Sequence, residues 1–359
     1  MGKASSEVLK PNQKLNSRNQ EMISDDSLSD FEKANPCSFI EKLIERIKEK
    51  KSVVCMGLDP RLEGEGTIPE YLIKDLEVPN DIILEFNKEL IDNTFDLIPI
   101  IKPQIAFYER YDALEALKDT ISYAHKKDLL VIIDSKRNDI STTSEAYAYS
   151  TFKMYEADAC TINAYLGKDG ITPFLKYKEK GIFILVKTSN PSSSDFQNLF
   201  SIKLDEIKDG ITEISIQDII KAGEKFNKIV LKRNYIRLAE FVKEWGLNLH
   251  KYNGFHSLGV VVGATYPYEL KRIREIVTSS FILIPGYGFQ GATAKDIKYG
   301  FNSRGLGGIV NSSRKIMFSY YYNGFAPYKF GEAAREEVIS MNQQINNEIN
   351  LWDNKLIIG

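Results

Sequence analysis

A cluster of charged residues directly follows one of the most apolar segments of the chain. Residues 129–133 are all aliphatic, and Asp134, Lys136 and Asp139 come immediately after them. Because side chains alternate along a strand, Asp134 and Lys136 would project to one side, while Asp139 would lie beyond the strand where the chain turns. A solvated surface turn is the alternative explanation, since such residues are common in turns. If the strand is buried, the pattern instead predicts a carboxylate and an ammonium held together in a reactive pocket.

The composition indicates an ordinary globular protein whose chemistry must use Asp and Lys. The 359 residues are 43% hydrophobic, which suffices for a full core. The 47 basic and 49 acidic residues nearly cancel, so we expect no nucleic-acid partner and local binding of any anion. The three cysteines and three histidines are scattered without CxxC or HExxH spacing. This argues against a disulfide framework, a metal site or a Ser-His-Asp triad, and favours a reducing, cytoplasmic location.

The sequence carries little sign of membrane targeting and has a polar N-terminal segment. No apolar segment approaches the roughly 20 residues that span a bilayer, and no secretory signal is present, so we expect no membrane association. Residues 1–6 match the short pattern for acylation of Gly2, which leaves that modification open. Residues 1–36 are polar and predict a disordered tail, followed by a domain over 37–350 and a C-terminal end over 351–359. Order should begin at Ser38, which forms a capping box with Glu41.

Short apolar segments alternate with segments of helical periodicity along the domain. This alternation predicts a (β/α)8 TIM barrel, with an open doubly wound sheet as the main alternative. The continuous apolar character of the segments is typical of parallel strands buried on both faces. The predicted strands are 53–58, 97–101, 129–133, 159–162, 182–186, 258–262, 281–284 and 308–310, and the clearest helices are 81–95, 111–127, 145–155 and 267–277.

The spacing is interrupted once, between the fifth and sixth predicted strands. Residues 191–257 separate these strands, and 211–245 have mostly helical periodicity. We therefore expect a helical insertion in a loop, since surface loops tolerate such length at small entropic cost. A separate domain is the alternative, but its own core would be thin.

The residues that follow the predicted strands are conspicuously polar, and barrel active sites lie at these carboxyl ends. The glycine-rich loop 285–291 carries Gln290, and Arg314 follows the eighth strand. Loops after the last two strands often bind phosphate, and an arginine can donate two parallel hydrogen bonds to it. Two tight turns that need glycine are the alternative explanation, but the presence of both Gln290 and Arg314 favours a phosphate site. The other polar exits are Asp59, Lys102, Asn163 and the segment 187–190.

Taken together, these segments resemble the orotidine 5'-phosphate decarboxylase family. The resemblance spans about 50–320 and rests on 57–60, Lys102, 134–140 with Thr143, 186–191 and 285–291 with Arg314. It implies a barrel that forms a homodimer with shared active sites. It also implies conversion of orotidine 5'-phosphate to UMP and CO2, the last step of pyrimidine nucleotide synthesis, without a cofactor.

The resemblance also implies roles for individual residues. Asp139 and Thr143 would enter the site of the partner chain, and Asp59 with Lys102 would face the ribose hydroxyls. Pro103 and Gln104 depart from the usual continuation of this segment, which leaves open whether Gln104 contacts the substrate. The charged network would comprise Lys102, Asp134, Lys136 and Asp139, the pyrimidine contacts Thr188 and Ser189, and the phosphate ligands Gln290 and Arg314.

The implied chemistry places a positive charge beside an anion that the pyrimidine ring cannot delocalise. Lys136 would stabilise and protonate C6, and Asp134 would lie against the substrate carboxylate and hold Lys136 charged. One alternative is a Mg2+-dependent phosphosugar barrel enzyme of the hexulose phosphate synthase type, which shares the DxKxxD spacing. Another is a catalytically dead barrel that only binds nucleotides. No phosphoribosyltransferase motif is present, so we expect a single activity.

Overall fold

The computed structural model describes residues 37–202, 215, 217–221 and 230–349. The chain divides into two units, Met1–Pro36 and Cys37–Gly359, and everything described below belongs to the second. The predictions for the tail 1–36, for acylation of Gly2, for the end 351–359 and for much of 211–229 lie outside the described residues.

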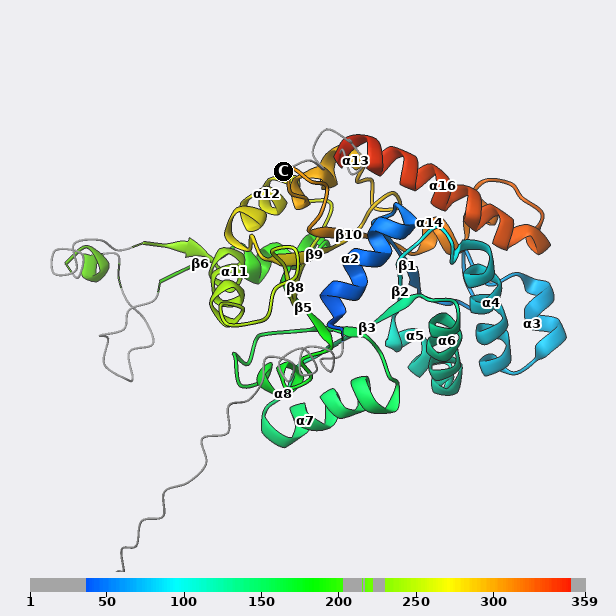
Figure 1. Cartoon of the computed structure of the whole chain (residues 1–359), viewed down its shortest axis with the longest axis horizontal. Helices are drawn as coiled ribbons and strands as arrows, with labels where there is room; N and C mark the ends of the chain where they lie inside the picture. The colour runs from blue at the N-terminus through cyan, green and yellow to red at the C-terminus, as the bar shows by residue number, and fades with distance from the viewer. Residues whose placement is uncertain (1–36, 203–214, 216, 222–229, 350–359) are drawn as a thin grey trace, which may run out of the picture. The chain divides into compact units, whose positions relative to one another are not determined.

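Eight parallel strands close into a barrel in the order β1-β2-β3-β4-β5-β8-β9-β10, and β10 pairs with β1 (Figure 1). The TIM-barrel prediction is therefore confirmed, and the open-sheet alternative is wrong. Each predicted apolar segment forms one strand, because a strand buried on both faces is apolar throughout. The strands are β1 Val54–Leu58, β2 Ile100–Pro103, β3 Leu130–Arg137, β4 Ala159–Ile162, β5 Gly181–Lys187, β8 His256–Val262, β9 Ser280–Pro285 and β10 Gly308–Ser312.

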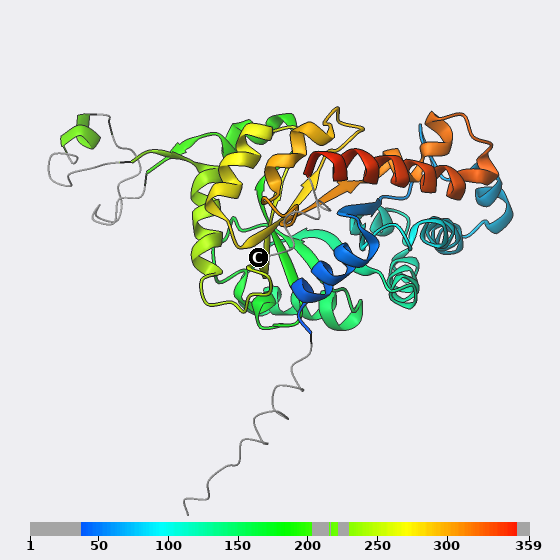
Figure 2. The same cartoon turned by 45° about the horizontal axis from the view of Figure 1, so that its top comes forward.

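Helices surround this barrel (Figures 1 and 2). The four predicted helices are confirmed as α4, α6, α7 and α12, although α7 is shorter and continues into the π-helical turn η1, Ser150–Met154. Over the described ranges, none of the helices combines the length and apolarity required to cross a membrane. The helices are α2 Phe39–Lys50, α3 Glu70–Leu76, α4 Pro79–Thr94, α5 Ile105–Arg110, α6 Leu114–Lys126, α7 Ser141–Tyr149, α8 Thr172–Leu175, α12 Pro267–Ile276, α13 Ala294–Ile297, α14 Arg314–Met317, α15 Ser319–Tyr322 and α16 Phe330–Ile349, with 3-10 turns η3 Lys298–Gly300 and η4 Pro327–Lys329.

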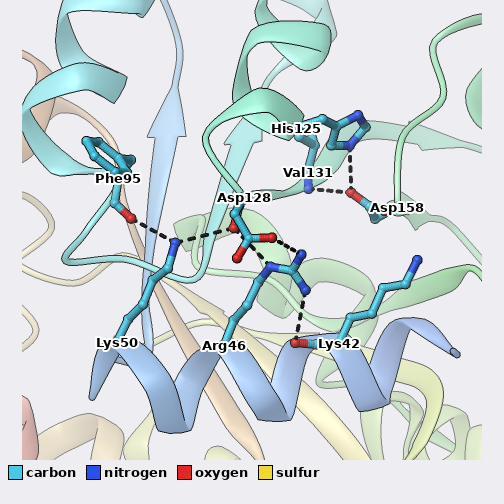
Figure 3. Close-up of polar contacts among 8 residues, drawn as sticks. All are labelled: Lys42, Arg46, Lys50, Phe95, His125, Asp128, Val131 and Asp158. Carbon is cyan, nitrogen blue, oxygen red and sulfur yellow. Dashed lines mark hydrogen bonds and ion pairs between the residues drawn. The ribbon is translucent and has the colours of Figure 1, made fainter.

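Helix α2 covers the amino-terminal ends of the strands, opposite the predicted active site. Its predicted capping box is present, with Ser38 as N-cap. From the half-buried flank of α2, the Arg46 Nε donates to the carbonyl of Asp128 at 2.9 Å and the Lys50 Nζ to the carbonyl of Phe95 at 2.8 Å (Figure 3). These carbonyls precede β3 and β2, so α2 satisfies backbone acceptors that the barrel leaves unpaired.

The segment between β5 and β8 combines a usual barrel helix with extra chain. The two strands pair directly, and helix α11, Asn234–Trp245, packs against both of them and against α12. Helix α11 thus takes the place of the ordinary barrel helix. The extra chain precedes it and includes the 3-10 turn η2 Pro191–Ser193, helix α9 Ser194–Gln197 and an antiparallel ribbon of β6 Phe200–Ser201 and β7 Lys232–Arg233, which projects beyond α11 (Figure 2).

Candidate active site

An array of two ammonium groups and one carboxylate, of which Lys102 and Asp134 are buried, lies at the carboxyl ends of β2 and β3. The Lys102 Nζ donates to the Asp134 Oδ2 at 2.7 Å, and the Lys136 Nζ donates to the Asp134 Oδ1 at 2.5 Å. The Thr161 hydroxyl, from β4, donates to the same Oδ1 at 2.8 Å. Lys102 is 4% exposed and Asp134 is 7% exposed, whereas the Lys136 side chain is 44% exposed. The predicted pairing of Asp134 with Lys136 is confirmed, and Lys136 is the member that reaches the open mouth.

The backbone of β3 departs from regular strand geometry where it carries this array. Its register against β4 shifts between Ile133 and Arg137, and Lys136 has a φ of 49°. A lysine in the left-handed region is strained, and such strain persists only where surrounding contacts hold it. Here the Lys136 amide donates to the Thr161 Oγ1 at 3.0 Å. Thr161 therefore fixes both the backbone of Lys136 and the carboxylate to which its ammonium bonds.

The charges in the array hold one another ionised. Burial alone would raise the pKa of Asp134, but Lys102 and Lys136 hold it well below its usual range. Burial alone would likewise lower the pKa of Lys102, but the charges of Asp134 and Asp59 raise it above its usual range. Since opposite charges at close range favour the ionised forms, both groups stay charged across the physiological pH range.

A second group of predicted residues meets across the exits of β5, β8 and β9. A Cβ at Gly263 would lie 2.9 Å from the Ser189 Cβ, and a Cβ at Gly286 would lie 2.7 Å from the Gln290 Oε1 and 3.6 Å from the Ser189 Cβ. Ser189 and Gln290 are therefore neighbours on either side of Gly286, whose φ is 102°. Glycine is required at 286, because a side chain there would be strained and would collide with Gln290.

The buried amine of Lys187 holds the turn that follows Ser189 in place. Lys187 is fully buried, its Nζ donates to the Ser193 Oγ at 2.6 Å, and it lies 4.2 Å from the ring centre of Tyr266. Burial lowers the pKa of Lys187. The hydroxyl of Tyr266 donates to the carbonyl of Asn190 at 3.3 Å. Lys187 and Tyr266 therefore hold both sides of the turn that follows Ser189.

Arg314 and Asp59 lie together at the exits of the adjacent strands β10 and β1. The Asp59 amide lies 3.3 Å from the Met317 sulfur, one turn from Arg314 in α14. The Arg314 guanidinium stacks 3.7 Å from the ring centre of Phe289. Burial and the nearby charge of Arg61 lower the pKa of Arg314. The Oδ1 of Asp59 is buried without a hydrogen-bond partner among the described residues.

The structure does not bring three predicted site residues, Thr188, Asp139 and Thr143, together with the residues described above. The Thr188 hydroxyl bonds to Asn190 and Gln197, and Thr188 lines a separate apolar pocket of about 810 Å³ beside α11. Asp139 accepts from the amide of Ile140 at 2.8 Å and pairs with no cation of the described residues. Thr143 is exposed on α7. The direction of Thr188 reflects the shifted register at the end of β5, which the local sequence does not reveal.

Two residues with clear roles in the geometry were not singled out from the sequence. Thr161 is the one polar side chain in the segment 159–162, and a hydroxyl in a strand buried on both faces is a usable signal. Arg61 follows the exit of β1, and its charge acts on Arg314, but the local sequence shows only another polar residue after a strand. Within the described ranges, no group of three or more His, Cys, Asp or Glu side chains is arranged to hold a metal ion.

Comparison with known proteins agrees with this geometry. A sequence model of the family described as orotidine 5'-phosphate decarboxylase / HUMPS matches residues 52–320, which contain all the site residues above. The chain belongs to this family. Two proteins named orotidine 5'-phosphate decarboxylase, from Petrotoga mobilis and Clostridium perfringens, are 39% and 41% identical to this member of the family. Each alignment covers 86% of this chain and 98% of the relative.

Solved structures of the family share the barrel. The Leishmania donovani OMP decarboxylase structure has a TM-score of 0.61 and 28% identity, and the match covers 85% of this chain and 99% of that one. The Leishmania donovani UMP synthase structure has a TM-score of 0.63 and 29% identity. That match covers 86% of this chain but 57% of the larger protein.

Proposed function

We propose that this chain is a carboxy-lyase that converts orotidine 5'-phosphate to UMP and CO2, the last step of pyrimidine nucleotide synthesis. The observation that carries the proposal is the array of Lys102, Asp134 and Lys136, with a preorganised ammonium at the mouth of a closed barrel. Family membership and relatives of that name at about 40% identity support it.

The proposed mechanism uses Lys136 as an electrostatic partner and then as an acid. Loss of CO2 from C6 leaves an electron pair in the plane of the ring, where the ring π system cannot delocalise it. An ammonium fixed beforehand at that point stabilises the pair without reorganisation, and it then donates its proton to C6. Asp134 and the strained backbone hold Lys136 in place. The negative charge of Asp134 also disfavours the neighbouring substrate carboxylate in the ground state.

The remaining groups would hold the nucleotide across the mouth. Ser189, beside Gly263 and Gly286, is proposed to bond the pyrimidine ring, with Gln290 and Arg314 as phosphate ligands. Asp59, whose Oδ1 lacks a described partner, is proposed to bond the ribose hydroxyls together with Lys102. Phosphate binding far from C6 can be used to lower the barrier at C6, because remote binding energy orients the reacting group.

The hydrogen bonds that Asp134 already accepts disfavour the Mg2+-dependent phosphosugar alternative. Its carboxylate already accepts from Lys102, Lys136 and Thr161. A hard cation would need those lone pairs and would be repelled by both ammonium groups. We therefore propose a reaction that needs no cofactor.

We further propose that the active form is a homodimer with shared sites. Asp139 forms no described bond to the array of its own chain, Thr143 is exposed, and Ile140 between them is an apolar residue that is 50% exposed. An exposed apolar side chain flanked by such residues fits an interface through which they enter the partner's site. We also propose cytoplasmic action, since all three cysteines are free and two are buried.

The decisive experiment follows the absorbance change of orotidine 5'-phosphate on decarboxylation, with and without EDTA. We expect turnover that EDTA leaves unchanged. Turnover lost in EDTA and restored by Mg2+ would favour the metal-dependent alternative, and absence of turnover with intact UMP binding would favour the catalytically dead barrel.

A further inference from the structure

Arg61, at the exit of β1, is a cation for which the described part of the chain supplies no counter-ion. Its guanidinium lies 5.7 Å from the ring centre of Phe107, and its buried Nε has no hydrogen-bond partner. By contrast, the neighbouring Arg110 forms an ion pair with Glu63. An arginine that stacks on an aromatic ring keeps its in-plane N–H groups free for another acceptor.

The loop that carries Arg61 is held against the helices that follow Arg314. Because β1 pairs with β10, with Met56 opposite Ser312, the exits of the two strands are adjacent. The Tyr320 hydroxyl of α15 donates to the carbonyl of Thr67 at 2.8 Å. The Asp59 amide, two residues before Arg61, contacts Met317. The loop therefore presents Arg61 towards the same part of the rim as Arg314.

The two guanidinium groups repel each other, as the lowered pKa of Arg314 reflects after the larger effect of its own burial. Each lies over an aromatic ring of the rim, Arg61 at 5.7 Å from the ring centre of Phe107 and Arg314 at 3.7 Å from that of Phe289. No described carboxylate forms an ion pair with either. Asp59 lies close to Arg314 and opposes this effect, but its single charge cannot balance two guanidinium groups, so an anion of two charges would relieve the remaining positive potential.

We propose that Arg61 is a second guanidinium ligand of the substrate phosphate, opposite Arg314, and that the pair makes the site selective for phosphate monoester dianions. This inference rests on the proposed function, because it takes the β9 and β10 exits as the phosphate end of the site. Phosphate oxygens accept the fork of N–H donors that each arginine offers. The dianion places one negative charge against each guanidinium, since the second pKa of a phosphate monoester is about 6.

The test compares the binding of UMP and uridine to Arg61→Gln by calorimetry on the full chain. We expect the dissociation constant of UMP to rise about 10- to 100-fold, the range for losing a charge-assisted bond, and that of uridine to stay unchanged. Arg61→Lys, which keeps the charge but loses the fork, should fall between wild type and Arg61→Gln. Arg110→Gln is the matched control and should bind UMP as wild type does.

An equal effect on uridine and UMP, or unchanged UMP binding by Arg61→Gln, would overturn the inference, as would an equal loss in Arg110→Gln. Arg61 is only half-buried in a surface loop, so Arg61→Gln is expected to fold. The binding of UMP and uridine to Arg61→Lys tests the inference independently. If wild type turns over orotidine 5'-phosphate while Arg61→Gln binds UMP normally, this inference alone fails. If wild type binds UMP in an Arg61-dependent way without turnover, the proposed function alone fails.

Discussion

Replacement of Asp134 by Asn should destabilise the protein in a way that depends on pH with a distinctive sign. Lys102 is 4% exposed and bonds Asp134 at 2.7 Å. Removing one partner of a buried pair leaves an uncompensated charge and typically costs about 3–5 kcal/mol. Lys136 adds little, because its side chain is 44% exposed and solvent screens it. We therefore expect Asp134→Asn to lose about 3–5 kcal/mol of unfolding free energy at pH 7.

The sign of the pH dependence follows from Lys102. In the wild type the pKa of Lys102 is raised above 10.5, so its stabilisation is present below pH 10.5 and is lost as pH rises through the raised value. In Asp134→Asn, burial should lower the pKa of Lys102 below 10.5, with Asp59 as the remaining opposing charge. The unfolded state would then bind more protons, so the stability of the variant should rise with pH towards 10.5. The deficit should therefore narrow between pH 7 and pH 10.

Urea denaturation of both proteins at pH 7 and pH 10 measures these differences. Asp128→Asn is the matched control, since the Asp128 side chain is 61% exposed beside Arg46 (Figure 3) and its φ of 56° suits Asn. That variant should stay within about 1 kcal/mol of wild type at both pH values. A deficit of Asp134→Asn that is no larger than the control, or that is the same at both pH values, would refute the account of a buried counter-ion.

Three further predictions concern the reaction, the interface and a buried imidazole. Lys136→Ala should lower turnover at least about 1000-fold, because it removes the preorganised charge, while UMP binding stays within about tenfold; substantial residual turnover would contradict its role. Mixing Asp139→Ala with Lys136→Ala should restore about a quarter of wild-type activity through mixed dimers with one intact site, and an inactive mixture would argue against shared sites. Burial lowers the pKa of His256 from 6.5 to about 4. As pH falls from 6.5 towards 4, His256 therefore takes up a proton in the unfolded state but not in the folded state. The free energy of unfolding should fall over this pH range by at most about 3 kcal/mol. His256→Gln should show a shallower fall in urea midpoint between pH 7 and pH 4.5, and an identical fall would contradict this assignment.

The local sequence was sufficient for the strands and for the identity of the central charged groups. Strands buried on both faces must be apolar throughout, so segments such as 159–162 could be located without knowledge of their neighbours. Asp134 and Lys136 could be paired because residues two apart on a strand share a side. Lys102 could be placed beside them because β2 and β3 are consecutive parallel strands whose carboxyl ends meet.

Only the tertiary structure decided the partners of these groups across the barrel. Arg61 and Arg314 lie far apart in sequence, and closure of the barrel through β1 and β10 brings their loops together. Thr161 bonds both Asp134 and the amide of Lys136, and the register of β3 against β4 shifts where Lys136 takes a positive φ. A similar shift at the end of β5 precedes Thr188, whose hydroxyl bonds to Gln197. Strand period is a local property of the chain, whereas register and closure depend on contacts between distant segments, and these contacts determine which side chains meet in the site.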